Sequence, residues 1–229
     1  MSDPYVLENG VLKNKLGIND YDELKTAETD IGFVKLLNVE QIEHDKCDIN
    51  LVKAIHKHIF EDIFDWAGEF RTIPIEKREL IIQGASLQYA EPRDINHKLE
   101  NVLEEMNDYD WNGKSVDEIS KSFTGFLARL WRVHPFRDGN TRTTLAFANI
   151  FSKEHGFEVD MTTMLNQLYR YQERETGKVV RWSIRDNFVL AALDKEDKPR
   201  PQALQKTMKQ AINKGKKKNT KSKTDDEGR

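Results

Sequence analysis

Apolar residues recur at helical spacing in three separate stretches of this 229-residue chain. Each stretch repeats every three to four residues, so its apolar side chains would line one face of an α-helix. The three faces are Leu51, Ile55, Ile59 and Ile63; Ile95, Leu99, Val102 and Met106; and Ile119, Phe123, Phe126, Leu127 and Leu130. Helices with one apolar face gain most of their stability by packing together, so the pattern predicts a mainly α-helical bundle.

Residues that start and stop helices fix the limits of two elements. Ser115 and Glu118 have the spacing of a capping box, in which each side chain satisfies an amide of the other residue, so a helix is expected to begin there. Another helix is expected to begin just after Gly139 and to stop at Gly156, because glycine adopts the left-handed conformation that ends helices. Shorter apolar patterns predict further helices over 162–174, 181–193 and 201–213.

One segment departs from the helical pattern. Two β-rich runs, Arg71–Ile75 and Leu80–Ile82, flank a polar stretch that has the character of a turn. Pro74 lacks an amide donor, so it fits only an edge strand. We therefore predict a small β-hairpin over about 71–82, with an open edge that can accept another strand.

Composition and length favour one domain over residues 1–200, followed by the helix at 201–213 and a basic tail at 214–229. Residues 195–229 hold 12 Lys and Arg against 5 Asp and Glu, although the whole chain has a net charge of −3. No apolar residue lies between Lys214 and Lys223, so disorder is expected from about Lys214. Nucleic-acid binding by this tail is the alternative to a solvated end, and we expect no nucleic-acid partner.

The chain has no apolar run of membrane-spanning length and does not open with a basic or apolar leader, so no membrane association is expected. Cys47 is the single cysteine, which is typical of a reducing compartment and predicts a cytoplasmic protein. His44 with Cys47, and His56 with His58, suggest zinc only weakly. The first pair lacks a second pair, and residues two apart on a helix do not face each other, so no metal site is expected there.

The segment His134-Pro-Phe-Arg-Asp-Gly-Asn-Thr-Arg142 lies between two predicted helices. Its Gly139 and Asn140 begin the second helix, where free amides and the helix dipole favour phosphate. Arg142 can clamp the same anion, Asp138 offers a hard oxygen for Mg²⁺, and His134 has the pKa of a general base. The alternatives are a helix-end histidine bonded to a carbonyl and a local salt bridge between Asp138 and Arg142.

This segment resembles the signature of the Fic family, His-Pro-Phe-x-Asp/Glu-Gly-Asn-x-Arg, at every specified position. Val11–Gly17 and Trp66–Arg71 also look like segments of bacterial Fic toxins, so the resemblance covers roughly residues 5–212. It implies a helical Fic core with a β-hairpin flap before the motif. It further implies a protein adenylyltransferase, a bacterial toxin that transfers AMP from Mg-bound ATP to a hydroxyl side chain of a target protein.

The resemblance assigns roles to individual residues. His134 would be the catalytic base and Asp138 the Mg²⁺ ligand. The nucleotide would be bound by Arg137, Gly139, Asn140, Thr141 and Arg142. The target, which in relatives can be a subunit of a type II topoisomerase, would dock as an added strand on the flap at Thr72, Ile73, Pro74 and Ile75.

Two positions depart from the family pattern. Thr141 stands where many members have Gly or Lys, and Leu145 replaces a second Arg that is usual in AMP-transferring members. A Doc-type phosphotransferase and a non-catalytic module that binds a nucleotide or a partner therefore remain as alternatives. The inhibitory pattern Ser/Thr-x-x-x-Glu-Gly/Asn is missing, since Glu227-Gly228 follows Lys223 instead, which favours a separate small antitoxin protein as partner.

Overall fold

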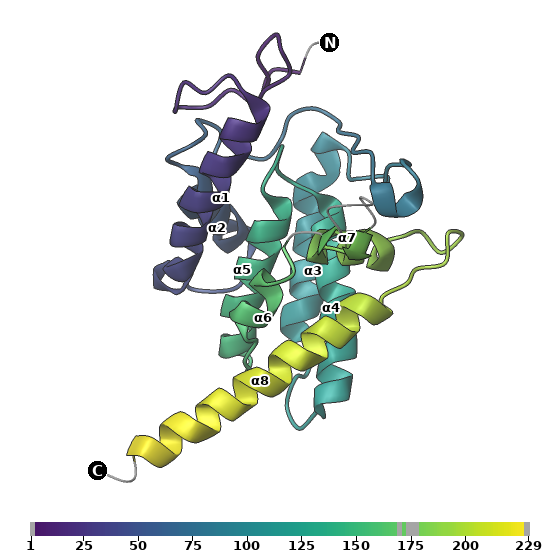
Figure 1. Cartoon of the computed structure of the whole chain (residues 1–229). Helices are drawn as coiled ribbons and strands as arrows, with labels where there is room; N and C mark the ends of the chain where they lie inside the picture. Colours follow the sequence, from purple (N-terminus) through teal and green to yellow (C-terminus); the bar gives the residue numbers. More distant parts are fainter. Residues whose placement is uncertain (1–2, 169–170, 173–178, 227–229) are drawn as a thin grey trace.

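The computed structural model describes residues 3–168, 171–172 and 179–226 (Figure 1). Its α-helices are α1 (Tyr21–Leu37), α2 (Ile49–Phe60), α3 (Ile95–Asp108), α4 (Val116–Val133), α5 (Asn140–Glu154), α6 (Met161–Leu165), α7 (Ile184–Ala191) and α8 (Gln202–Asp226). Short 3-10 helices are η1 (Val39–Gln41), η2 (Leu80–Ile82) and η3 (Pro92–Asp94). The strands β1 (Tyr171–Gln172) and β2 (Val179–Arg181) pair antiparallel.

The core is built around α5, which the apolar faces of neighbouring helices cover. Eleven of its 15 residues are buried, and it packs against α2 and α4. The predicted apolar faces form the matching surfaces: Leu51, Ile55 and Ile59 on α2 are all at most 1% exposed. The capping box of Ser115 and Glu118 begins α4, which confirms the prediction made for that helix. The mainly α-helical fold class is therefore confirmed.

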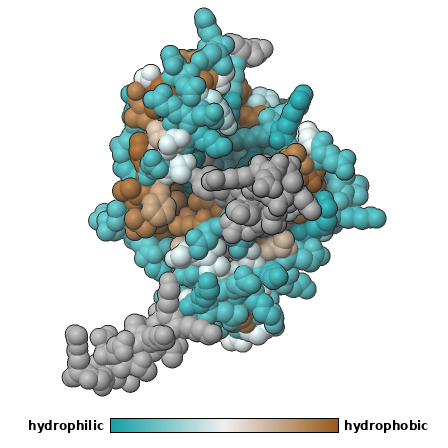
Figure 2. Space-filling model, viewed as in Figure 1, coloured by the Kyte–Doolittle hydropathy of each residue, from teal (hydrophilic) through white to brown (hydrophobic). Residues whose placement is uncertain are grey.

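Helix α1 was not predicted, because it has no clear apolar face. Its start is fixed by Asp20, whose carboxylate accepts from the amides of Asp22 and Glu23. It packs along α2 and leaves Phe33, Val34 and Leu37 49%, 58% and 64% exposed. Figure 2 shows a mainly hydrophilic face that is interrupted by apolar residues on the side where α1 lies.

The β-hairpin predicted over 71–82 is not formed. Residues 72–73 form a bend, residues 74–79 pair with no strand that the structure describes, and Leu80–Ile82 turn into η2. The turn is closed by Gln83 in the left-handed region, with φ 59°, and by the Gly84 amide, which donates to the Glu79 carbonyl. The β-rich residues Leu80–Ile82 are thereby used in a tight turn instead of a returning strand.

The helix predicted over 162–174 is also too long. Helix α6 ends at Leu165, and Tyr171–Gln172 forms β1, whose partner β2 includes Arg181. Positions 169–170 and 173–174 of that prediction lie outside the described residues. The helix predicted over 181–193 is found as the shorter α7, because Arg181 belongs to β2 and Ser183 caps the helix start. Gly156 follows α5 with φ 76°, as expected for a helix stop.

The C-terminal helix extends well beyond the predicted limit at residue 213. Its apolar residues Leu204, Met208, Ala211 and Ile212 are fully buried, and α8 packs on α4, α6 and α7. The helix continues to Asp226, so the disorder expected from Lys214 is not found over 214–226. Helix propensity explains the extension, because Lys, Asn and Thr cost a helix only tenths of a kcal/mol per residue. No helix among the described residues is both long and apolar enough to cross a membrane.

Candidate active site

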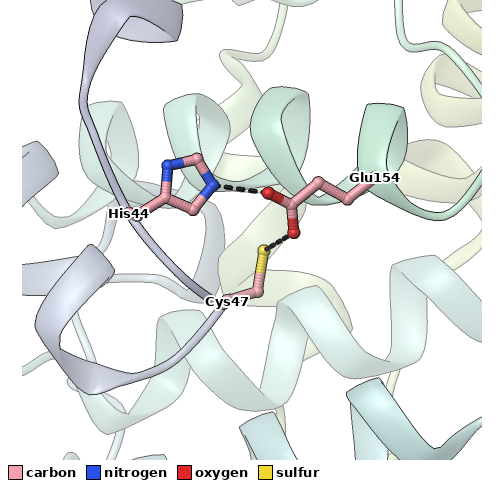
Figure 3. Close-up of side chains that lie close together, drawn as sticks. All are labelled: His44, Cys47 and Glu154. Atoms are coloured by element: carbon pink, nitrogen blue, oxygen red, sulfur yellow. Dashed lines mark hydrogen bonds and ion pairs between the residues drawn. The ribbon is translucent and has the colours of Figure 1, made fainter.

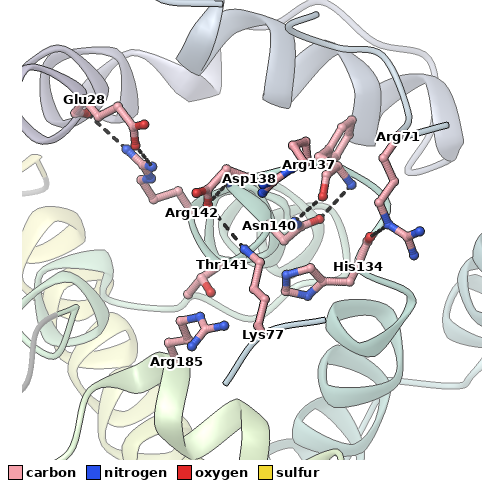
Figure 4. Close-up of polar contacts among 12 residues, drawn as sticks. Glu28, Arg71, Lys77, His134, Arg137, Asp138, Asn140, Thr141, Arg142 and Arg185 are labelled. Carbon is pink, nitrogen blue, oxygen red and sulfur yellow. Dashed lines mark hydrogen bonds and ion pairs between the residues drawn. The ribbon is translucent and has the colours of Figure 1, made fainter. Parts of the chain in front are cut away.

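A cleft of about 750 Å³ opens beside the segment 134–142, which is an ordinary size for a ligand site. Its walls come from α1, from the segment 72–79 between Arg71 and η2, from the 134–142 loop and from α7 (Figure 4). Of the described residues, six with cationic side chains and two with acidic side chains line it. They are Lys25, Lys77, Arg78, Arg137, Arg142 and Arg185, with Glu28 and Asp138. This excess of positive charge favours an anionic ligand.

His134 ends α4 in the left-handed conformation, with φ 51°. Its side chain is 1% exposed, and Nδ1 lies 3.3 Å from the Trp131 carbonyl oxygen. Among the described residues, no group hydrogen-bonds Nε2. Burial, together with the charges of Lys77 and Arg185, holds the pKa of His134 well below its usual range. A neutral ring that donates from Nδ1 leaves the Nε2 lone pair free to accept a proton.

The start of α5 forms an anion site. Gly139 is its N-cap, with φ 79°, and no side chain in the described part of the chain caps the first amides of the helix. A side chain at Gly139 is sterically excluded, because a Cβ there would lie 2.3 Å from Cε2 of Phe60. The amides that follow Gly139 are therefore unshielded at the positive end of a 15-residue helix, as phosphate binding requires.

The loop that presents this helix is held by hydrogen bonds within it. The Asn140 side chain accepts from the Phe136 amide at 2.9 Å and donates to the Phe136 carbonyl at 2.8 Å. Phe136 is fully buried and stacks on His56, with ring centroids 3.7 Å apart. The Asn140 side chain thus shapes the loop, because both of its polar atoms bond to the Phe136 backbone. Thr141 likewise uses its hydroxyl within the fold, accepting from the Trp131 indole at 2.9 Å.

The two arginines of the motif are paired with acids far away in the sequence. Arg142 donates to the Glu28 carboxylate at 2.7 Å and to the Glu28 carbonyl at 3.0 Å. Arg137 pairs with Asp3 at 2.8 Å. The local salt bridge considered between Asp138 and Arg142 is not formed, since Asp138 faces Lys77 at 3.7 Å instead. Both arginines still line the cleft.

Asp138 meets the requirements of a Mg²⁺ ligand. Burial opposes charge on its carboxylate, but Lys77 and Arg142 outweigh burial and hold the pKa of Asp138 well below its usual range. One Asp138 oxygen accepts from the Gly139 amide at 2.6 Å. Its side chain is 40% exposed, so an ionised oxygen is accessible from the cleft. Mg²⁺ commonly uses one protein carboxylate and takes its other ligands from phosphates and water.

Arg71 connects the segment 72–79 to the 134–142 loop. Its guanidinium is 2% exposed and donates to the His134 carbonyl at 2.9 Å and to the Ile73 carbonyl at 2.7 Å. Its amide donates to the Pro135 carbonyl at 2.8 Å. After Arg71 the side chains alternate between exposed and half-buried positions, with Thr72 and Pro74 exposed and Ile73 and Ile75 half-buried. The four predicted docking residues thus lie in one segment with alternating exposure, which leads to Lys77 and Arg78 at the cleft.

Sequence analysis missed several residues of the site. Lys77 and Arg185 supply positive charge near His134. The Glu28 carboxylate holds Arg142, and His56 Nε2 lies 3.1 Å from the Asp138 carbonyl oxygen. Arg185 comes from α7 and is itself held by Glu79, to which it donates at 2.5 Å. Leu145 is fully buried in the core, so it leaves no cation at that position. Of these residues, only His56 could have been found from the sequence, because it is a polar residue beside the apolar face of α2.

The fold and the site define a helical domain with an anion-binding cleft beside a buried, neutral histidine. A model of the Fic/DOC family matches residues 46–152, from the loop before α2 to near the end of α5. A probable protein adenylyltransferase of Sinorhizobium fredii is 30% identical over 152 residues, which is 66% of this chain and 74% of that protein. The chain belongs to the Fic/DOC family.

Other known proteins agree. A protein adenylyltransferase of Bartonella schoenbuchensis is 28% identical over 162 residues, which is 69% of this chain but only 32% of that longer protein. The structure of the BepC effector of Bartonella tribocorum with bound AMPPNP has a TM-score of 0.68 and 19% identity, covering 92% of this chain and 97% of that one. A Fic domain of a Bartonella quintana effector has a TM-score of 0.67 and 19% identity, covering 90% of each chain. The fold of the chain is therefore that of the Fic domains.

Proposed function

We propose that this protein is an adenylyltransferase that transfers AMP from Mg-bound ATP to a hydroxyl side chain of a target protein. The observation that carries the proposal is His134, a neutral buried base whose Nε2 has no hydrogen-bond partner among the described residues. It lines a cationic cleft next to a helix N-terminus. Relatives named as protein adenylyltransferases support this activity, and so does the AMPPNP bound by BepC.

Each group would have a defined role in the transfer. The first amides of α5 and Arg142 bind the phosphates, and Arg137 is placed to add a second guanidinium. Asp138 would hold Mg²⁺, which neutralises phosphate charge when bound. The target hydroxyl oxygen forms a bond to the α-phosphorus, the bond from that phosphorus to the pyrophosphate breaks, and the hydroxyl proton passes to Nε2 of His134. Arg71 keeps the histidine in position through its carbonyl.

We also propose that the target docks at Thr72, Ile73, Pro74 and Ile75. The alternation of exposed and half-buried side chains over residues 72–78 supports this role, since a peptide can add as a strand beside such a segment. Lys77 lies in the same segment and faces Asp138 at 3.7 Å, so a docked peptide would lie close to the reacting groups. A toxin role, a type II topoisomerase target and a separate small antitoxin are part of the same proposal and rest on family resemblance.

The test is transfer of label from ATP to protein. The purified protein is incubated with bacterial lysate, Mg²⁺ and ATP labelled in parallel at the α- or the γ-phosphate. We expect α-label on a protein band, lost in His134→Ala and retained in His97→Gln, which changes an exposed histidine of α3. Transfer of γ-label instead would identify a phosphotransferase. That activity is the alternative because Leu145 stands where AMP-transferring members usually have a second motif arginine. Nucleotide binding with neither transfer would identify a non-catalytic module.

A further inference from the structure

A second cluster of chemically active side chains lies away from the cleft. His44 Nε2 is 2.5 Å from one carboxylate oxygen of Glu154, and the Cys47 thiol donates to the other oxygen at 3.1 Å (Figure 3). One donor atom from each of the three residues lies within 4.8 Å of the others. Figure 3 shows the three side chains converging on one point, with the carboxylate between the imidazole and the thiol.

The fold brings together residues that are far apart in the sequence. His44 and Cys47 belong to the loop between η1 and α2, whereas Glu154 is the last residue of α5. The cluster is therefore at the opposite end of α5 from the 134–142 loop, about 22 Å away at 1.5 Å per residue. Sequence analysis rejected His44 and Cys47 as metal ligands for lack of further ligands, and the structure supplies a third one from 107 residues beyond Cys47.

Surrounding groups hold the three side chains in place. His44 Nδ1 lies 2.8 Å from the Ile42 carbonyl oxygen, which fixes the ring and directs Nε2 toward Glu154. The Cys47 carbonyl accepts from the Asn107 side chain at 2.9 Å. Metal-binding histidines usually have this arrangement, because a carbonyl on the second ring nitrogen fixes the tautomer and orientation of the ligand.

A catalytic thiol is excluded by the order of the groups. In a cysteine nucleophile the imidazole lies next to the sulfur and takes its proton, whereas here the carboxylate separates the two. Cys47 is 1% exposed, and burial together with Glu154 raises the pKa of the thiol. Such a thiol is a poor nucleophile, although a cation that replaces its proton can still bind the sulfur.

We propose that His44, Cys47 and Glu154 form a site for a borderline-soft divalent cation, with Zn²⁺ as the expected ion. One nitrogen, one sulfur and one carboxylate oxygen suit zinc, and water can complete four ligands because Glu154 is 40% exposed. The cation replaces the thiol proton and the proton shared between His44 and Glu154, and both protons pass to solvent without a change in oxidation state. Bound metal joins the loop before α2 to the end of α5 and so stabilises the two helices that carry the active site.

The test uses the full chain with Co²⁺ as a spectroscopic substitute for Zn²⁺. Cys47 is the single cysteine, so thiolate-to-cobalt charge-transfer absorption can arise only from this site. We expect the band to saturate at one equivalent, with proton release, and to disappear when Zn²⁺ is added. Zn²⁺ should also raise the Tm of the protein.

Variants distinguish the site from nonspecific binding. Cys47→Ser should lose the band, His44→Gln and Glu154→Gln should weaken binding about 10-fold to 100-fold, and His97→Gln should bind like the unchanged protein. If a variant fails to fold, the cobalt band and the Zn²⁺-dependent Tm of the unchanged protein still test the proposal. No charge-transfer band and no Zn²⁺-dependent rise in Tm would overturn the proposal and leave a hydrogen-bonded chain that only joins two segments.

Discussion

His56 and His134 are both buried and neutral, yet their environments assign them different roles. His56 accepts from the Gly68 amide at 2.9 Å through Nδ1, and its Nε2 lies 3.1 Å from the Asp138 carbonyl oxygen. Both nitrogens of His56 are thus used, so it positions the backbone of the loop. His134 has one nitrogen at a carbonyl and the other without a partner among the described groups. That unused lone pair separates a base from a structural histidine.

The buried histidines predict loss of stability in mild acid. Burial lowers the pKa of His56 to about 3, whereas an unfolded histidine has a pKa of about 6.5. Between these values the unfolded state binds more protons, so the free energy of unfolding falls as pH decreases below about 6.5. His56 alone should cost about 2 kcal/mol at pH 5 relative to pH 7. Urea denaturation at the two pH values measures the difference.

Two variants separate this effect from other titrations. His56→Gln removes the titrating ring, so its stability should be lower at pH 7 but should fall by about 2 kcal/mol less on going to pH 5. His97→Gln changes an exposed histidine and should keep the full dependence. Burial raises the pKa of Glu28, so protonation of Glu28 stabilises the folded state as pH falls, opposite to the effect of His56. The test therefore compares the pH dependence of the variants with that of the unchanged protein. Equal pH dependence in all three proteins would contradict the assignment.

At the scale of elements, α1 brings an acid into a site that must bind an anion. Glu28 is 8% exposed and pairs with Arg142, the arginine expected to clamp phosphate. Asp138 lies near enough to Glu28 to raise the pKa of its carboxyl further, after burial. A bound triphosphate would add more negative charge to this group, so Glu28 and the nucleotide compete for the same guanidinium.

Removal of this charge should strengthen nucleotide binding. Glu28→Gln keeps an oxygen that can accept from Arg142 and removes the negative charge, so the affinity for Mg-ATP should rise about 3-fold to 10-fold, or about 0.7–1.4 kcal/mol. Isothermal titration calorimetry measures the Kd. Glu23→Gln changes an exposed acid in the first turn of the same helix and should leave the Kd unchanged. Weaker binding in Glu28→Gln would instead identify Glu28 as a residue that positions Arg142.

Helix α7 is joined to the segment 72–79 by a buried ion pair. Glu79 is fully buried and accepts from Arg185 and, at 3.1 Å, from the Tyr89 hydroxyl. Arg185→Met should lower the free energy of unfolding by about 3–5 kcal/mol, because it leaves an uncompensated buried carboxylate. Addition of Glu79→Gln to that variant should recover part of the loss. Denaturation curves measure both effects.

A second Arg–Glu pair provides the comparison. Arg129 also forms two hydrogen bonds to a carboxylate, that of Glu105, but both side chains are about half exposed. Solvent screens this pair, so Arg129→Met should cost less than about 1 kcal/mol. Similar losses in Arg129→Met and Arg185→Met would show that burial of Glu79 does not control the energy of the α7 contact.

At the scale of the whole molecule, the sequence predicted those elements whose formation depends on residues close together in the chain. Apolar spacing identified α2, α3 and α4, and His134 and residues 137–142 line the cleft. Contacts between distant segments left no such pattern. The pairing of Glu28 with Arg142 and of Glu79 with Arg185 joins residues 114 and 106 positions apart. The hairpin at 71–82 was predicted wrongly because β propensity depends on a partner strand, and no strand that the structure describes pairs with this segment.

Helix α8 crosses the molecule and packs on α4, α6 and α7 through residues 204–212, whereas its C-terminal part projects away from the domain (Figure 1). A Cβ at Gly215 would lie 2.4 Å from the Glu158 carbonyl oxygen, so this glycine permits backbone contact between α8 and the chain after α5. Gly215→Ala should therefore lower stability by about 1–3 kcal/mol, as overpacking does. Gly125 is exposed within α4 with no atom within 4 Å of its Cβ position, so Gly125→Ala should raise stability by about 0.5–1 kcal/mol. Urea midpoints that shift in opposite directions would place α8 at Gly215 against the domain, whereas a stabilising Gly215→Ala would mean that the helix does not contact the domain there.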